Sequence, residues 1–266
     1  MLYDRSQTEV SRGALAELVL ALELYKDDFV LAGGWAPYFL TQGYMEHCGS
    51  IDIDLVLRPS IMARYETIRD IVTDLGYKPT KNPFRFEREF ETLNGTPFPL
   101  HLDFLTEPEV KNQVETLLRV QNGLQAVFIP GCSVIFTYNY METVRGILPL
   151  GGEGSATIRI SDIVGTLTMK GLALGRPRKL EKDSYDIYTV AGFYGGDPYQ
   201  AASRFKQLVE KLGNNIKPKV TVRALSKISD GFASSNGYAA RAVSRFIGED
   251  RSTDATERVS AFLSQV

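Results

Sequence analysis

The chain has little cysteine and no long apolar run, and both absences narrow its class. Only Cys48 and Cys132 occur among 266 residues, too few for the disulfide framework of a small secreted protein. The apolar stretch from residue 15 to residue 24 is interrupted by two glutamates, so no membrane-spanning segment is predicted. The first residues lack a basic flank followed by an apolar run, so no export signal is expected. These features predict a protein of the cytoplasm.

A large excess of one charge is also missing. The chain has 30 Lys+Arg against 32 Asp+Glu, and 44% of its residues are hydrophobic, which excludes disordered and collagen-like classes. The charge is unevenly placed: residues 1–150 sum to −7 and residues 151–266 to +5. This asymmetry suits a protein that holds cations at one place and polyanions at another, although ordinary solvated surfaces can be equally lopsided.

Strand patterns come before residue 160 and helical patterns after it. The chain should open with an amphipathic helix over residues 8–25, and Ser60 is expected to cap a helix that runs to about Leu75. Strands are predicted at residues 29–32, 51–57, 84–90, 100–105, 126–136 and 156–160. This order predicts an α+β protein, in which a mixed-sheet domain of residues 1–160 precedes a mainly helical domain of residues 161–266.

Two carboxylates on one strand are the most informative feature of the sequence. Asp52 and Asp54 alternate with apolar residues, so their side chains project from the same face of the strand. Two like charges about 5–6 Å apart repel by a few kcal/mol at an effective dielectric constant of about 20. Mg²⁺ would offset this repulsion, because it prefers hard oxygen ligands and accepts substrate phosphates. The alternative is an exposed edge strand whose outer face is acidic.

A third carboxylate lies on another apolar strand. Asp103 and His101 share one face of the strand at residues 100–105. If this strand neighbours the first, Asp103 completes a cluster of three acids, which can hold two Mg²⁺ ions for phosphoryl-type displacement. His101 is either a partner of this cluster or a structural residue.

A glycine pair precedes the acidic strand. Gly33 and Gly34 form a turn before an expected helix, and their backbone N–H groups could hold a phosphate there, although glycine pairs also simply make turns. Ser50 could offer a hydroxyl to a phosphate or cap the preceding turn.

Basic and acidic residues recur after residue 160. Lys170 falls on the apolar stripe of an expected helix, where it either extends to solvent or reaches a triphosphate. Farther on, Lys182, Asp183 and Asp186 open another helix. Asp183 could serve as the N-cap of that helix, with Asp186 favourable in its first turn, or both could serve the site.

In chain order these motifs resemble a known family. Gly33-Gly34, Ser50-Ile51-Asp52-Ile53-Asp54-Leu55, Leu102-Asp103-Phe104, Lys170 and Lys182-Asp183-Ser184-Tyr185-Asp186-Ile187-Tyr188 are similar to motifs of the AbiEii-type nucleotidyltransferases. That family includes the MenT-like toxins and belongs to the DNA polymerase β-like superfamily. The resemblance covers roughly residues 28–190. It implies a mixed-sheet nucleotidyltransferase fold whose helical C-terminal domain completes a cleft for nucleotide and acceptor.

The resemblance also implies roles for individual residues. Asp52, Asp54 and Asp103 would be catalytic ligands of Mg²⁺, with two ions expected, and Lys170 would be catalytic and contact the triphosphate. The nucleotide-binding set would be Gly33, Gly34, Ser50, Lys170, Lys182, Asp183 and Asp186. Trp35 and Cys48 depart from the family pattern, which has a small or hydroxylated residue and an arginine at these places.

The implied reaction is transfer of NMP from an NTP to an acceptor hydroxyl. One Mg²⁺ would activate the hydroxyl and the other would neutralise the leaving pyrophosphate, and Asp103 could also accept the proton. The resemblance and the basic second half favour an RNA acceptor, such as a tRNA 3′ end, and a toxin or phage-defence protein with a cognate antitoxin. The alternatives are transfer to a small molecule such as an aminoglycoside, and a non-catalytic nucleotide-binding partner.

Overall fold

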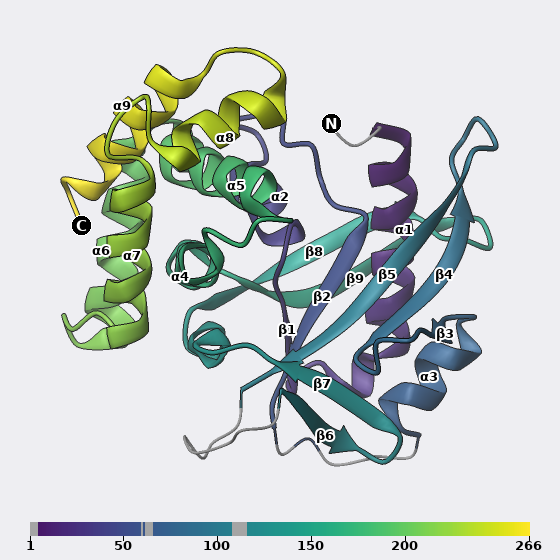
Figure 1. The fold of residues 1–266 in the computed structure, drawn as a ribbon. Helices are drawn as coiled ribbons and strands as arrows, with labels where there is room; N and C mark the ends of the chain where they lie inside the picture. The colour runs from purple at the N-terminus through teal and green to yellow at the C-terminus, as the bar shows by residue number, and fades with distance from the viewer. Residues whose placement is uncertain (1–4, 60, 62–65, 108–115) are drawn as a thin grey trace. The chain divides into compact units, whose positions relative to one another are not determined.

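The computed structural model describes residues 5–59, 61, 66–107 and 116–266, and the chain divides into two compact units. The sheet unit comprises the described parts of Tyr3–Trp35 and Gly49–Ile160, and the helical unit comprises Ala36–Cys48 and Ser161–Val266. Figure 1 shows the strands of the first unit and the helices of the second. The division after residue 160 coincides with the change from strand to helix patterns, whereas no sequence pattern indicated that residues 36–48 belong with the helices.

Within the residues that the structure describes, the sheet unit contains a mixed sheet of nine strands. Its main path runs β3-β4-β5-β2-β1-β9-β8, and β7 joins β5 and β6 beside it. The strands are β1 (Phe29–Leu31), β2 (Asp52–Leu57), β3 (Lys78–Pro79), β4 (Arg85–Glu91), β5 (Pro97–Thr106), β6 (Leu117–Gln121), β7 (Leu124–Phe128), β8 (Asn139–Ile147) and β9 (Glu153–Ser161).

The centre of the sheet is β5-β2-β1. β2 pairs with β5 in parallel and with β1 antiparallel. Ile53, Leu55 and Val56 of β2 are completely buried, which fits a strand covered on both sides. An exposed edge strand is therefore excluded for Asp52 and Asp54.

One face of the sheet is covered by α1 (Arg5–Ala21), which packs against β8 and β4 (Figure 1). A Cβ on Gly13 would lie 1.8 Å from the main-chain oxygen of Ile147, so only glycine permits this close approach of helix and strand. On β4, Arg88 pairs with Glu17 of α1 at 2.6 Å. Residues of β4 alternate in direction, so Arg85 and Glu87 project from the opposite face.

The helical unit is organised around α5 (Leu180–Phe193), which contacts α4, α6, α8 and α9. Its residues from Asp183 to Gly192 are all buried, as expected of a helix surrounded by others. No helix of the described ranges is both long and apolar enough to cross a membrane. The other helices are α2 (Trp35–Thr41), whose first residue belongs to the sheet unit, α4 (Ile163–Ala173), α6 (Pro198–Gly213), α7 (Lys219–Gly231), α8 (Tyr238–Ile247) and α9 (Ser252–Leu263).

The predicted α+β class is confirmed, but several predicted elements are wrong in detail. The strand expected at residues 126–136 ends at Phe128, because a left-handed turn at Gly131 leads into a 3₁₀ helix at Cys132–Phe136. The helix expected from Ser60 is α3 (Ile68–Asp74), capped by Thr67; Ser60 itself lies outside the described residues. β3, β6 and β8 were not predicted.

Candidate functional site

Asp52 and Asp54 project side by side from one face of β2. The register with β5 places Asp54 opposite Asp103 and Asp52 opposite His101. In a parallel sheet, paired residues share a face. The two strands therefore bring the three predicted aspartates together on the face that carries Arg85.

Arg85 neutralises part of this acidic cluster. Its Nε donates to Oδ1 of Asp103 at 2.7 Å, and its Nη2 donates to Oδ2 at 2.6 Å. This two-bond geometry is the strong form of an arginine–carboxylate pair. The hydrogen bond with Asp103 raises the pKa of Arg85, and the charges of Asp52 and Asp54 act in the same direction. Asp103 is thus held in place by two hydrogen bonds that it accepts.

His101 links two carboxylates of the same face. Its Nδ1 lies 3.0 Å from Oδ1 of Asp52, and its Nε2 lies 3.9 Å from Oε2 of Glu87. The contact fixes the orientation of the Asp52 carboxylate. His101 therefore acts as a partner of the cluster.

The turn before α2 is shaped around Asp54. Gly33 has φ +65°, and a Cβ at this position would lie 1.8 Å from Oδ2 of Asp54. Both the conformation and the lack of space require glycine. Ser50 is buried, and its hydroxyl donates to the main-chain oxygen of Asp52 at 2.9 Å. Ser50 thus shapes the start of β2.

The donor set suits a divalent cation at Asp52 and Asp54. Their oxygens are hard ligands on one strand, and Gly33 leaves the space that the Asp54 carboxylate occupies. Asp103 differs, because both of its oxygens bind Arg85. Within the ranges that the structure describes, no three His, Cys, Asp or Glu side chains are grouped to hold a metal ion.

The lysines and aspartates predicted after residue 160 meet within the helical unit. Nζ of Lys170 lies 2.9 Å from Oδ1 of Asp183 and 2.7 Å from Oδ2 of Asp186. Nζ of Lys182 lies 2.6 Å from Oδ1 of Asp186. The proposed N-cap role of Asp183 is wrong, because α5 begins at Leu180 and Lys179 holds the cap position.

The charges of this cluster stabilise one another. Lys170 is partly buried, which on its own would lower its pKa, but Asp183 and Asp186 together raise the pKa above its usual value. Burial tends to raise the pKa of Asp186, yet Lys170 and Lys182 hold it below its usual range. The side chains of Lys170 and Lys182 keep 13% and 15% of their surface exposed.

Sequence reasoning missed His47 as a member of this cluster. Its Nε2 lies 3.0 Å from Oδ1 of Asp186, although 139 residues separate the two in the chain. Its ring also packs against that of Tyr185, 5.1 Å away between centroids. No local pattern identifies His47, which is the neighbour of Cys48 and lies three residues before Ser50.

His47 predicts a pH dependence of stability. Burial, followed by the charge of Lys182, lowers the pKa of His47 to about 4, although Asp186 opposes the shift. The unfolded chain therefore binds a proton near pH 6.5 that the folded chain accepts only near pH 4. The folded state should lose about 3 kcal/mol through this group as pH falls across that window.

The variant His47→Gln, whose side-chain amide can still donate to Asp186, should lack this part of the pH dependence. Urea unfolding of both chains at pH 7.5 and pH 4.5 measures the difference. An equal loss of stability in the two chains would contradict the burial of a neutral histidine.

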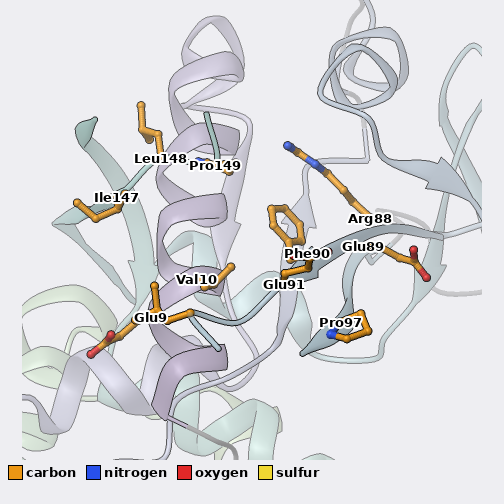
Figure 2. A pocket seen from close by; sticks show the side chains of 11 residues that line it. Glu9, Val10, Arg88, Glu89, Phe90, Glu91, Pro97, Ile147, Leu148 and Pro149 are labelled. Carbon is orange, nitrogen blue, oxygen red and sulfur yellow. The ribbon is translucent and has the colours of Figure 1, made fainter. Parts of the chain in front are cut away.

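A cavity of about 570 Å³ opens elsewhere on the sheet unit, where α1, β4 and the β8–β9 hairpin meet. Figure 2 shows Ile147 and Leu148 on one side of α1 and Phe90 on the other. Arg88 and Phe90 lie on the α1 side of β4, opposite the side chain of Arg85. Among the described residues that line the cavity, none was predicted for the site.

Comparison with known proteins agrees with the resemblance noted in the sequence. The family model described as "Nucleotidyl transferase AbiEii toxin, Type IV TA system" matches residues 14–264. Among solved structures, an antigenic nucleotidyltransferase-like protein from Paracoccidioides brasiliensis is 12% identical, with a TM-score of 0.42, over 78% of this chain and 92% of the other. No curated protein sequence matches the chain.

Proposed function

Because the chain belongs to the AbiEii family of nucleotidyl transferase toxins, we propose that it uses Mg²⁺ to transfer NMP from an NTP to a hydroxyl group of RNA, such as a tRNA 3′ end. The chain is a nucleotidyltransferase, and its type IV toxin–antitoxin family implies a cognate antitoxin. One observation carries the proposal for the sheet unit: two carboxylates project side by side from a strand whose apolar residues are buried.

Asp52 and Asp54 would hold the metal ion. When bound there, Mg²⁺ would neutralise charge on the phosphates and lower the pKa of the attacking hydroxyl. His101 keeps the Asp52 carboxylate in one orientation, and Gly33 lets Asp54 lie against the turn before α2. Backbone N–H groups of Gly33 and Gly34 would bind phosphate at that turn.

Lys170 and Lys182 would bind nucleotide phosphates as point charges. Asp183 and Asp186 hold their ammonium groups in place. Arg176 adds a third positive charge, with Nη2 3.8 Å from Oδ2 of Asp183. The three cations outnumber the two carboxylates, so the cluster keeps a net positive charge that favours an anionic ligand.

The basic second half of the chain supports an RNA acceptor. Exposed cations lie along α6 and α7, where they would contact successive phosphates. Those exposed are Arg204, Lys206, Lys211, Lys219, Arg223 and Lys227. Lys217 is half-buried, and its Nζ donates to the main-chain oxygen of Val266.

Incubation of the pure protein with each labelled NTP, Mg²⁺ and total RNA tests the proposal. We expect label in RNA, with RNA binding that weakens steeply as salt rises, because released counterions dominate the affinity of phosphate contacts. A cell extract stripped of RNA is added in a second reaction. If the label then appears in a small molecule, the acceptor is a hydroxylated metabolite rather than RNA. No transfer despite nucleotide binding would reject the enzymatic proposal.

A further inference from the structure

The pairing of Arg85 with Asp103 divides the three aspartates into two kinds. Asp103 is buried, with 6% of its side chain exposed, and both of its oxygens accept hydrogen bonds from Arg85. A metal ion at Asp103 would have to share a carboxylate whose two oxygens already accept charge-assisted hydrogen bonds, and it would lie beside the positive guanidinium. The two hydrogen bonds of Arg85 go to Asp103, while the charges of Asp52 and Asp54 act on its guanidinium without such a bond.

The guanidinium of Arg85 has one anchored edge and one open edge. Among the described residues, its hydrogen bonds use Nε and Nη2 only, whereas a guanidinium carries five N–H donors. A quarter of its side chain is exposed. The remaining donors are therefore available on the face that carries Asp52 and Asp54, in the fork geometry that suits phosphate oxygens.

The positive charge of Arg85 also disfavours a second divalent ion beside Asp103. A second ion would add positive charge next to a guanidinium that is already fixed there.

We infer that Arg85, anchored by Asp103, is a phosphate-binding residue of this site, and that the site takes one divalent ion, at Asp52 and Asp54, in place of the two ions expected from three carboxylates. The inference rests on the proposed function, because it assigns the nucleotide's phosphates as the anion. Asp103 is then a positioning residue for Arg85.

Titration of the full-length chain with Mn²⁺, followed by the EPR signal of the free ion, tests the metal count without any turnover. We expect one Mn²⁺ per wild-type chain and loss of that binding in Asp54→Asn. Arg85→Gln should bind Mn²⁺ at least about tenfold more tightly, because it removes a positive charge beside the ion and releases Asp103. Two ions per wild-type chain, with one lost in Asp103→Asn, would overturn the inference.

Binding of the α,β-methylene analogues of the four nucleoside triphosphates, at saturating Mn²⁺, tests the phosphate contact. For the analogue that binds best, Arg85→Gln should weaken binding at least about tenfold. The double variant with Asp103→Asn should bind no more weakly than Arg85→Gln alone, since Asp103 acts through Arg85. Wild-type affinity in Arg85→Gln would overturn the inference.

Arg88→Gln is a matched control, because it removes an arginine of the same strand, also paired with a carboxylate, on the opposite face. It should leave both measurements unchanged within about twofold. If circular dichroism shows that Arg85→Gln does not fold, Arg85→Lys, which keeps the charge but not the two-bond fork, should give intermediate values; wild-type values would overturn the inference. Because Mn²⁺ counting needs no acceptor, failure of the proposed transfer reaction remains distinguishable from failure of this inference.

Discussion

The variant Asp54→Asn should transfer nucleotide at least about a thousandfold more slowly than the wild-type chain. An amide carries no charge, so the strand would lose one of the two anionic ligands that hold the cation at the phosphates. Loss of one well-placed electrostatic contact in an active site typically costs two to three orders of magnitude, and the bound cation would supply more than one such contact. The rate of label transfer, with the NTP and acceptor that the wild-type chain uses, measures the effect.

The fold should survive this change. Asp54 lies near Asp52 and Asp103, so removing one negative charge reduces repulsion in the cluster. The free energy of unfolding in urea should therefore stay equal or rise. Asp74→Asn, at an exposed position of α3, serves as the control and should keep activity within about twofold. Wild-type turnover in Asp54→Asn would show that Asp54 is not a ligand of the metal ion. The proposed reaction would then lose its basis.

Asp186→Ala should lower the free energy of unfolding by about 3–5 kcal/mol, because removal of one partner leaves buried charges uncompensated. Asp186 is completely buried and pairs with Lys170, Lys182 and His47. Lys170 would keep Asp183, whereas Lys182 would lose the carboxylate that lies 2.6 Å from its Nζ. Urea unfolding at pH 7.5 measures the loss.

Glu181→Ala is the matched control on the same helix. Glu181 pairs with Arg245 at 2.9 Å, but both side chains are about half exposed, and exposed pairs contribute at most about 1 kcal/mol. A loss below 1 kcal/mol in Asp186→Ala would show that water, rather than the aspartate, compensates the two ammonium groups.

Spacing along single strands predicted much of the sheet unit. Alternation identified the shared face of Asp52 and Asp54, and a lone acid within an apolar strand identified Asp103. β8 was not predicted, because buried and exposed residues alternate little along it. It lies at the edge of the sheet, but α1 packs against it. The strand predicted at residues 126–136 failed because apolar residues continue past the turn at Gly131 into a 3₁₀ helix, and apolar content alone does not distinguish the two.

Sequence patterns did not predict which side chains from distant segments pair with each other. The alternation Phe84-Arg85-Phe86-Glu87 placed Arg85 on a polar face, but only the register between β4 and β5 brings it opposite Asp103. His47 was missed for the same reason, since its partner Asp186 lies on α5. Asp183 is not the helix cap, because α5 begins at Leu180 and its N-cap is Lys179, four residues before Asp183. Local chemistry thus predicted which residues matter, and tertiary structure determines which of them meet.

The turn between β4 and β5 has a consequence for the carboxylate site. Thr92 closes it with hydrogen bonds to Thr96, and Gly95 supplies its left-handed residue. This loop sets the pairing of Arg85 with Asp103, although it lies about 20 Å along the strand at 3.4 Å per residue. Deleting one loop residue would turn every β4 side chain to the other face, placing a phenylalanine opposite Asp103 and aiming the guanidinium at α1. The length of this loop therefore determines whether a positive charge lies beside the carboxylates, although the loop is far from them.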